Sequence, residues 1–323
     1  RAAAAIRTFD PRPSYLSALT ALLDSACIRK ARLKIAVDCL YGTCRGYLDE
    51  LLVRWGLSPV VIHDYLNPSF GGRPPEPARE FIPELRAAVK KNKFHLGLAC
   101  DGDADRFGIV DAGGVFLTPN EVFSLALAYL IRTRGAARTV ARSLATTHFI
   151  DAIARREGLE VVETPVGFKY IGEALHGGDC LIGGEESGGL SIRGHVPEKD
   201  GVLACLLMAE MAAREKKTLS VLLRELRARY GSYYADKINV HLRPEQQRQV
   251  LKKIERYRTA KSFAGMAIRR RDFRDGCKLL FAEDHWVLFR ASGTEPVVRC
   301  YCEASSRARL RALVALAKKE LGV

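Results

Sequence analysis

The sequence lacks several features that define large classes of proteins. No apolar run approaches the roughly 18 residues that a membrane-spanning helix needs, so we expect no transmembrane segment. The nine cysteines form no C-x-x-C pair, and their odd number argues against a disulfide framework or a zinc site. The alanines at 2–5 form too short an apolar stretch for a signal peptide. These absences predict a reduced, cytoplasmic protein.

The composition is that of a folded protein whose C-terminal part is basic. Hydrophobic residues make up 48% and charged residues 27% of 323 positions, which excludes disorder as the main state and predicts two or three domains. The net charge is +14, and residues 235–323 hold 20 Lys and Arg against 10 Asp and Glu. A basic segment attracts nucleic acid, acidic membranes or phosphorylated small molecules, and charge alone does not choose among them.

Apolar periodicity divides the chain into three blocks. In residues 1–117 and 118–232, short β-rich runs alternate with helical stretches, which is typical of βαβ units around a largely parallel sheet. Thr118, followed by Pro119 and by Glu121, predicts a capped helix start in the second block. Residues 233–323 predict successive strands and two helices. We therefore expect two related α/β domains followed by a smaller α+β domain.

The strongest chemical signal is the acidic segment Asp101-Gly102-Asp103-Ala104-Asp105-Arg106, directly after a predicted strand. Its three carboxylates repel one another unless a cation neutralises them, and oxygen ligands of this kind suit Mg²⁺. An EF-hand is excluded because Arg106 and Ala112 stand where that loop needs Gly and Glu. The alternative is a solvated acidic turn. The end of a strand in an α/β sheet, where ligands usually bind, favours the metal.

Two further loops carry groups suited to ligands. The first, GGEESGG at 183–189, combines a flexible backbone with Glu and Ser side chains that bind hydroxyl groups, and it matches neither a P-loop nor a dinucleotide fingerprint. The second, RASGTEPVVR at 290–299, combines two arginines, two hydroxyls and a glycine, which together suit a phosphate. Taken alone, each loop could instead be a turn within a hairpin.

Weaker signals lie elsewhere in the second block. A Val166-Gly167 turn follows a predicted strand, and Lys199 with Asp200 stands at a predicted helix start, where Asp200 could serve only as an N-cap. His148 is interpreted as a residue of a helix start. Trp55 and Trp286 are expected in the core.

In this order and spacing, the loops at 101–106, 183–189 and 290–299 resemble those of the α-D-phosphohexomutase family, which includes bacterial phosphoglucomutases and phosphomannomutases. The resemblance covers essentially the whole chain, and the combination is far more specific than any one loop. It implies a heart-shaped enzyme of four domains, in which three related α/β domains precede a smaller domain that closes over the substrate. The three blocks at 1–117, 118–232 and 233–323 then correspond to family domains two, three and four.

The resemblance also implies roles for individual residues. It makes Asp101, Asp103 and Asp105 the Mg²⁺ ligands, and it gives catalytic positions to Arg106, beside a phosphoserine, and to Lys199. The substrate-binding positions that it implies are Val166, Gly167, Glu185, Ser187, Arg290, Ser292, Gly293, Thr294 and Arg299.

The family's reaction interconverts hexose 1-phosphates and 6-phosphates. A phosphoserine donates its phosphoryl group to the sugar phosphate, the bisphosphate intermediate reorients, and its other phosphate returns to the serine. The family's serine lies in a Thr-x-Ser-His-x-Pro type motif of domain one, whereas this chain starts at Arg1 and contains no Ser-His dipeptide. We therefore expect that the N-terminal phosphoserine domain of the same gene product is missing and that this chain alone is an inactive fragment.

The substrate preference expected from the resemblance is glucose phosphate first and mannose phosphate second. Dual-specificity members often have His where Gly189 stands, and phosphoglucosamine mutases tend to have Gln at the position of Glu186. The pattern of 185–189 is therefore closer to that of glucose-preferring members.

Three alternatives come from other classes of protein. A Mg²⁺-dependent phosphatase with Asp101 as nucleophile would carry Thr or Val where Asp105 stands. A non-catalytic sugar-phosphate-binding module would keep the binding loops without the serine. A nucleic-acid binder is suggested by charge only, because the basic block lacks a recognisable RNA-reading motif with stacking aromatics. We expect a hexose phosphate as the partner, and neither nucleic acid nor a membrane.

Overall fold

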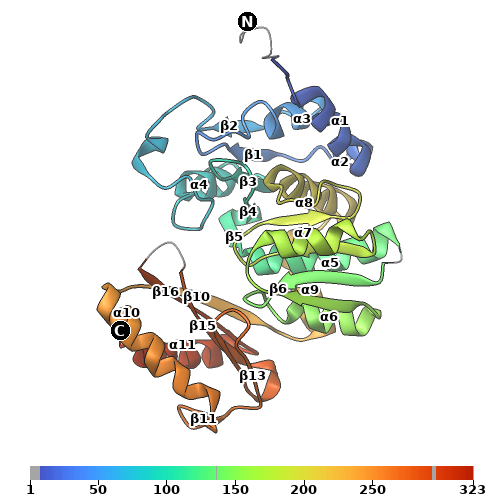
Figure 1. The fold of residues 1–323 in the computed structure, drawn as a ribbon. Helices are drawn as coiled ribbons and strands as arrows, with labels where there is room; N and C mark the ends of the chain where they lie inside the picture. The colour runs from blue at the N-terminus through green and yellow to red at the C-terminus, as the bar shows by residue number, and fades with distance from the viewer. Residues whose placement is uncertain (1–7, 136, 293–295, 323) are drawn as a thin grey trace, which may run out of the picture.

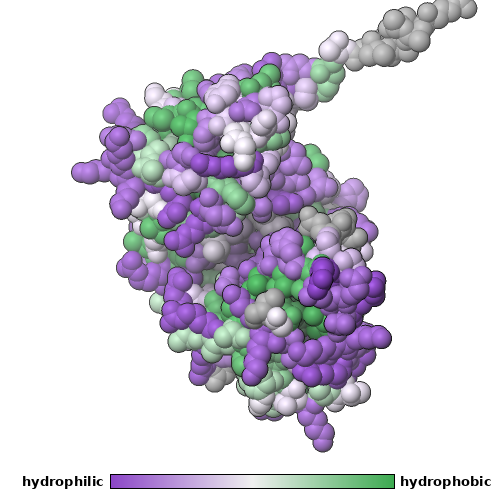
Figure 2. All heavy atoms as spheres, turned by 90° about the vertical axis from the view of Figure 1, so that its left-hand side faces the viewer, coloured by the Kyte–Doolittle hydropathy of each residue, from purple (hydrophilic) through white to green (hydrophobic). Residues whose placement is uncertain are grey.

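The computed structural model describes residues 8–135, 137–292 and 296–322. Figure 1 shows three units that follow one another along the molecule, with the N-terminal unit at the top and the C-terminal unit at the bottom. Within the described ranges, no helix combines the length and the apolar character that crossing a membrane requires. Hydrophilic residues cover most of the face shown in Figure 2, and apolar residues are exposed there in separate groups.

The first unit is a five-stranded sheet in the order β2-β1-β3-β4-β5 with helices on both faces. Its strands are β1 (Ile35–Asp38), β2 (Val60–Ile62), β3 (Leu96–Cys100), β4 (Phe107–Asp111) and β5 (Val115–Leu117), and its helices are α1 (Arg12–Leu22), α2 (Ser25–Ala31), α3 (Leu48–Arg54) and α4 (Pro83–Lys91). The first three strands are parallel, whereas β4 and β5 return antiparallel. Every residue of β1, β3 and β4 is buried, as expected for strands covered on both faces.

The second unit repeats this plan with four strands in the order β7-β6-β8-β9. Its strands are β6 (Thr139–Ser143), β7 (Glu160–Thr164), β8 (Cys180–Gly184) and β9 (Leu190–Ile192), and the helices of this stretch are α5 (Pro119–Arg134), α6 (Phe149–Glu157), α7 (Phe168–His176), α8 (Gly201–Glu215) and α9 (Leu219–Tyr230). The predicted start of α5 is confirmed. The Thr118 side chain accepts from the Glu121 N–H, and the Glu121 side chain accepts from the Thr118 N–H.

Helix α8 connects the first two units. Although it follows the second sheet in the sequence, it packs against α2, β3 and β4 of the first unit and also against α5. Its residues 201–213 are all buried, and all of them except Glu210 are apolar, as expected for a helix inside a core. One continuous apolar core therefore extends from α1 to α9 across both units.

The third unit is an antiparallel sheet in the order β10-β16-β15-β14-β13, which confirms the predicted α+β domain. Its strands are β10 (Tyr234–His241), β11 (Ser262–Phe263), β12 (Met266–Ala267), β13 (Arg270–Asp272), β14 (Cys277–Leu280), β15 (Trp286–Ala291) and β16 (Val297–Ala304), and its helices are α10 (Pro244–Glu255) and α11 (Arg307–Leu321). The pairing of β11 with β12 and the edge strand β13 were not predicted, because two- and three-residue strands show no apolar periodicity.

The third unit packs on the second through the face of its sheet that α11 does not cover. Trp286, Leu288 and Tyr301 form a buried cluster with Leu144 and Ala145, which follow β6. Trp286 is therefore a core residue, as predicted, although the core it belongs to lies between two units. Trp55 is buried within the first unit.

Candidate functional site

The acidic segment forms the turn between β3 and the antiparallel β4. The Arg106 N–H donates to Asp101 Oδ1 at 2.9 Å, and the Ala104 N–H donates to the Asp101 carbonyl at 3.1 Å. Ala104 has a left-handed backbone, with φ of 65°. This folding brings one carboxylate oxygen from each of Asp101, Asp103 and Asp105 within 4.8 Å of the other two. The structure thus gathers the three predicted ligands on one short turn.

The electrostatics of this turn favour a bound cation. Burial, together with the neighbouring carboxylates of Asp105 and Asp103, raises the pKa of Asp101 to about 7. Asp105 Oδ1 is buried and has no hydrogen-bond partner among the described residues. A divalent cation would satisfy that oxygen and offset the repulsion, and an all-oxygen donor set with an exposed member, Asp103, suits Mg²⁺. The residues present therefore fit the expected metal.

Two cations border the acidic turn. Lys199 Nζ lies 2.5 Å from Asp105 Oδ2, and Arg106 Nε lies 3.7 Å from both Asp101 Oδ2 and Asp105 Oδ1. The Lys199 side chain reaches this position across Gly189, where an added Cβ would stand 2.5 Å from Lys199 Cδ. The second unit thus supplies a cation to a turn of the first.

The glycine-rich loop is the turn between β8 and β9, and it contacts the first residue of β4, directly after the acidic turn. The Phe107 N–H donates to the Gly188 carbonyl at 3.2 Å. Glu185 is buried, and its Oε1 accepts from the Gly167 N–H at 2.8 Å. Burial, followed by the neighbouring Glu186, raises the pKa of the Glu185 carboxyl. Ser187 lies half-buried on the same turn.

Asp200 caps helix α8 and holds its first turn in place. Its carboxylate accepts from the Leu203 N–H at 2.8 Å and from the Tyr15 hydroxyl, and it contacts His195 Nε2 at 2.7 Å. The N-cap interpretation of Asp200 is therefore confirmed. The next residue, Gly201, donates its N–H to the Ala104 carbonyl at 2.9 Å, so the helix begins against the acidic turn.

Replacing Gly201 with alanine is expected to push α8 away from that turn. An added Cβ would lie 2.3 Å from the Arg106 carbonyl oxygen and 2.9 Å from that of Ala104, and neither backbone atom can move aside cheaply. We expect the free energy of unfolding to fall by about 1–3 kcal/mol in urea titrations. The matched control is Gly177→Ala, where φ is −65° and the nearest atom is 3.6 Å from the added Cβ. Equal midpoints for the two variants would contradict the prediction.

A residue that the sequence did not single out joins the second unit to the third. Asp275 lies in the turn between β13 and β14, and its Oδ2 accepts from the Val166 N–H at 3.0 Å. Its Oδ1 accepts from Arg290 Nε at 2.8 Å. Asp275 therefore links the loop that carries Val166 and Gly167 to the predicted phosphate-binding arginine. The only local signal was the Asp275-Gly276 dipeptide, which indicates a turn and no function.

The two arginines of the basic loop lie opposite each other. Arg290 on β15 pairs with Arg299 on β16 in the antiparallel register. Like charges at directly opposed positions destabilise a sheet unless they are compensated, and Asp275 compensates the charge of Arg290 here. Ser292 follows β15 and donates its N–H to the Val297 carbonyl at 2.8 Å. Gly293 and Thr294 lie outside the described residues.

Models of known protein families match almost all of the chain. Three models of phosphoglucomutase/phosphomannomutase domains match it in order: the alpha/beta/alpha domain II at residues 13–114, the alpha/beta/alpha domain III at residues 118–230 and the C-terminal domain at residues 238–319.

Individual relatives agree with the family models. A phosphoglucomutase/phosphomannomutase of Thermococcus kodakarensis is 32% identical over 98% of this chain and 66% of its own length. A phosphoglucomutase of Komagataeibacter xylinus is 30% identical over 93% of this chain and 58% of its own length. The chain thus spans about three fifths to two thirds of these relatives.

A solved structure agrees as well. The crystal structure of a candidate phosphomannomutase from Thermus thermophilus is 34% identical and superimposes with a TM-score of 0.85, covering 99% of this chain and 68% of the other. The order of three matched domains, the identity to curated relatives and the shared fold lead to one conclusion. The chain belongs to the phosphoglucomutase/phosphomannomutase family.

Proposed function

We propose that this chain carries the metal-binding and substrate-binding parts of a phosphohexomutase, an isomerase that interconverts hexose 1-phosphates and 6-phosphates. The observation that carries the proposal is the convergence of loops from all three units. Phe107, which directly follows the acidic turn, contacts Gly188 of the glycine-rich loop, and Lys199 pairs with Asp105. Asp275 then connects Val166 of the second unit to Arg290 of the third.

In this proposal the acidic turn binds Mg²⁺ through Asp101, Asp103 and Asp105. Bound Mg²⁺ would offset negative charge on a phosphoryl group during its transfer. The Arg106 side chain is 39% exposed, so its guanidinium can reach a phosphate oxygen next to the metal ligands. Lys199 supplies a second positive charge on the side of the glycine-rich loop.

The sugar and its second phosphate are held by the other two loops. Glu185 and Ser187 stand on the turn that faces the acidic segment, and they can bind sugar hydroxyl groups, together with the backbone at Val166 and Gly167. The opposed Arg290 and Arg299 hold the phosphate that is not reacting, with help from the residues at 292–294. The same binding mode then serves both phosphoryl transfers. The bisphosphate intermediate reorients between the two transfers, and each phosphate takes the position that the other one held.

We further propose that the phosphoserine comes from a segment outside these 323 residues, since they contain no Ser-His dipeptide. Glucose phosphate is the preferred substrate in this proposal. Gly189 supports that preference, because dual-specificity members of the family often have His at this position.

Calorimetric titration of the purified chain tests the binding part of the proposal. We expect glucose 1-phosphate to bind more tightly than mannose 1-phosphate, and Mg²⁺ to strengthen the binding. Arg290→Ala should weaken it about 10-fold to 100-fold, the usual range for a charged hydrogen bond to phosphate. Arg311→Ala, an exposed arginine on α11, is the matched control. Absence of any sugar-phosphate binding would contradict the proposal.

A coupled mutase assay tests the origin of the serine. With glucose 1-phosphate, glucose 1,6-bisphosphate and Mg²⁺, the chain alone should produce no glucose 6-phosphate, whereas a full-length family enzyme in the same assay should. Turnover by the purified chain would show that the nucleophile lies within these residues. That result would not contradict the proposed metal-binding and substrate-binding sites.

A further inference from the structure

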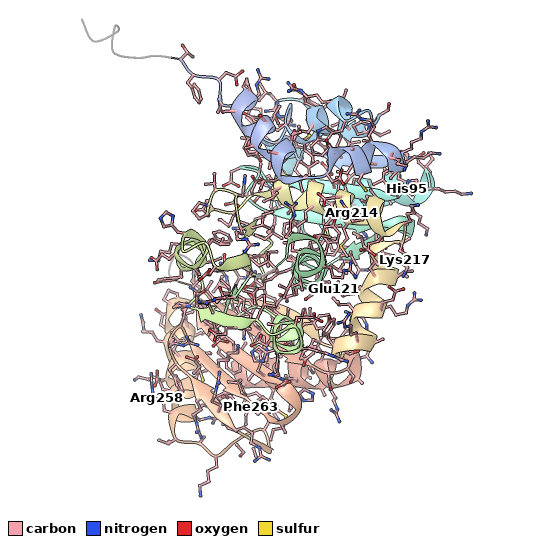
Figure 3. All side chains as sticks on the ribbon, turned by 90° about the vertical axis from the view of Figure 1, so that its right-hand side faces the viewer. His95, Glu121, Arg214, Lys217, Arg258 and Phe263 are labelled. Atoms are coloured by element: carbon pink, nitrogen blue, oxygen red, sulfur yellow. The ribbon has the colours of Figure 1, made fainter. Side chains whose placement is uncertain are left out.

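A cavity of about 640 Å³ lies at the edge of the first sheet opposite to the acidic turn. It is lined by Leu33 and His95, which precede the parallel strands β1 and β3, whereas Asp101 follows β3. The C-terminal end of α8 closes the cavity with Ala213. Because α8 begins at the acidic turn and spans about 21 Å, the cavity is separate from the candidate active site. In Figure 3 the labelled side chains of His95, Arg214 and Lys217 lie near one another where the first two units meet.

The floor of this cavity is apolar and consists of alanines and one leucine. Ala31 of α2 and Leu33 contribute from one side, and Ala212 and Ala213 of α8 contribute from the other. Apolar side chains of this kind offer a ligand no hydrogen-bonding groups. Such a floor suits a flat apolar ring better than a sugar, whose hydroxyl groups would lose their hydrogen bonds to water there.

The rim of the cavity is positively charged. Lys30 and Lys216 line it and are exposed, and neither has a carboxylate within 4.0 Å among the residues that the structure describes. Two further cations of the rim are neutralised, since Arg214 pairs with Asp24 and Lys217 pairs with Glu225. The positive charge available to a ligand therefore comes from the two lysines.

His95 adds a hydrogen-bond donor to the rim. Its Nδ1 accepts from the Lys34 N–H at 2.8 Å, so the proton of a neutral ring lies on Nε2, which can donate to a ligand. The single carboxylate of the lining, Asp111, does not oppose an anion strongly. Its oxygens accept from the Leu219 and Ser220 N–H groups at 3.1 and 2.8 Å, at the positive end of α9.

We propose that this cavity binds an organic phosphate of nucleotide size, with its phosphate groups at Lys30, Lys216 and His95 and its flat ring on the alanine floor. The charge of the rim and the apolar floor complement the two halves of such a molecule. The volume lies within the range of about 300–1,000 Å³ that is typical of small-molecule sites. Inorganic phosphate would leave the floor uncovered, and a nucleoside would leave the lysines without an anion.

Cys27 provides a built-in reporter of binding. It lines the cavity and is partly exposed, whereas the other cysteines, all of them within the described residues, are buried. The rate of its alkylation by iodoacetamide, followed by mass spectrometry of the α2 peptide, measures access to the cavity. We expect ADP to slow this rate at least about 5-fold at saturation, and adenosine, inorganic phosphate and glucose 1-phosphate each to change it less than about 2-fold.

A double variant, Lys30→Ala with Lys216→Asn, removes both free charges, and asparagine tolerates the left-handed backbone of Lys216. We expect the ADP concentration needed for half protection to rise about 10-fold or more. The charge-matched control is Lys252→Ala with Lys261→Asn, two exposed lysines of the third unit, and it should behave as the original chain.

Two results would overturn the proposal. The first is that millimolar ADP fails to slow alkylation of Cys27 in the original chain. The second is that inorganic phosphate protects Cys27 as well as ADP does. That result would show that the charged rim alone binds the anion and that the apolar floor does not contribute. Equal loss of protection in the control pair would overturn the assignment of Lys30 and Lys216.

Discussion

Replacing Asp105 with asparagine is expected to weaken Mg²⁺ binding by about 100-fold, equivalent to about 2.7 kcal/mol. Asp105 Oδ1 is buried and has no hydrogen-bond partner among the described residues, and one carboxylate oxygen of Asp105 lies in the cluster with those of Asp101 and Asp103. An asparagine keeps the shape of the side chain but lacks the negative charge that a hard divalent cation requires. The repulsion that now raises the pKa of Asp101 would fall, yet one of three charged ligands would be lost.

Isothermal titration with Mg²⁺ measures this effect directly. The matched control is Asp64→Asn, an exposed aspartate of the same unit that lies outside the acidic turn, and its Mg²⁺ affinity should equal that of the original chain. Thermal unfolding in the presence of a chelator separates a lost ligand from a misfolded turn, because Asp105→Asn should then melt within a few degrees of the original. Unchanged Mg²⁺ affinity in Asp105→Asn would contradict the assignment of the metal site.

The second large effect concerns a buried lysine between the second and third units. Lys278 on β14 is 1% exposed, and its Nζ donates to the Leu144 carbonyl at 2.6 Å and contacts His148 Nε2 at 2.9 Å. Nζ also lies 3.3 Å from Glu163 Oε2 and 4.4 Å from the centre of the Trp286 ring. One ammonium group therefore holds three groups of the second unit to the sheet of the third.

Lys278→Ala is expected to lower the free energy of unfolding by about 2–4 kcal/mol, because it leaves buried acceptors without a donor and opens a space beside Trp286. Glu163 keeps Arg142 as a partner at 2.8 Å, so the effect stays below that of a fully unpaired buried charge. Fluorescence of Trp286 in a Trp55→Phe background reports unfolding at this interface during a urea titration. Lys237→Ala, an exposed lysine of β10, should change the free energy by less than about 0.5 kcal/mol.

The same lysine predicts a pH dependence with a definite sign. Burial, followed by the charge of Arg142, lowers the pKa of Lys278 to about 8, whereas an unfolded lysine titrates near 10.4. Between these pH values the unfolded chain binds more protons than the folded chain, so the free energy of unfolding should rise with pH. Below about pH 8 the folded chain carries the full free-energy cost of burying the charged lysine. The difference in free energy of unfolding between the original chain and Lys278→Met isolates this contribution. A difference in free energy of unfolding that stays constant from about pH 8 to ~10.4 would contradict the predicted pH dependence.

Much of the fold followed from local patterns. The apolar strands β1 and β3 and the capped start at Thr118 were predicted because periodicity and capping residues act within a few positions of the chain. The expected order of two α/β domains and one α+β domain followed from these elements. The short strands β11–β13 were missed because their stability comes from neighbouring strands rather than from their own residues.

Part of the candidate site could likewise be predicted from local patterns, and part of it could not. The acidic turn could be predicted because its three ligands lie within five positions and follow a strand whose end faces the ligand-binding edge of the sheet. The role of Asp275 could not be predicted, since its contact with Val166 joins residues 109 positions apart. The burial of Lys278 was equally hidden, because lysine is rarely buried unless a partner elsewhere compensates its charge.

The sequence by itself determined the order of the secondary-structure elements, the three loops and their chemistry, because each depends on residues that are neighbours in the chain. Only the tertiary structure decided that α8 leaves the second sheet to cover the first, that Lys199 reaches Asp105, and that Asp275 lies between Val166 and Arg290. These contacts form when apolar faces pack together and bring distant polar groups within hydrogen-bonding distance. No local pattern records which distant groups will meet, and the same packing created the cavity at Cys27 on the far edge of the first sheet.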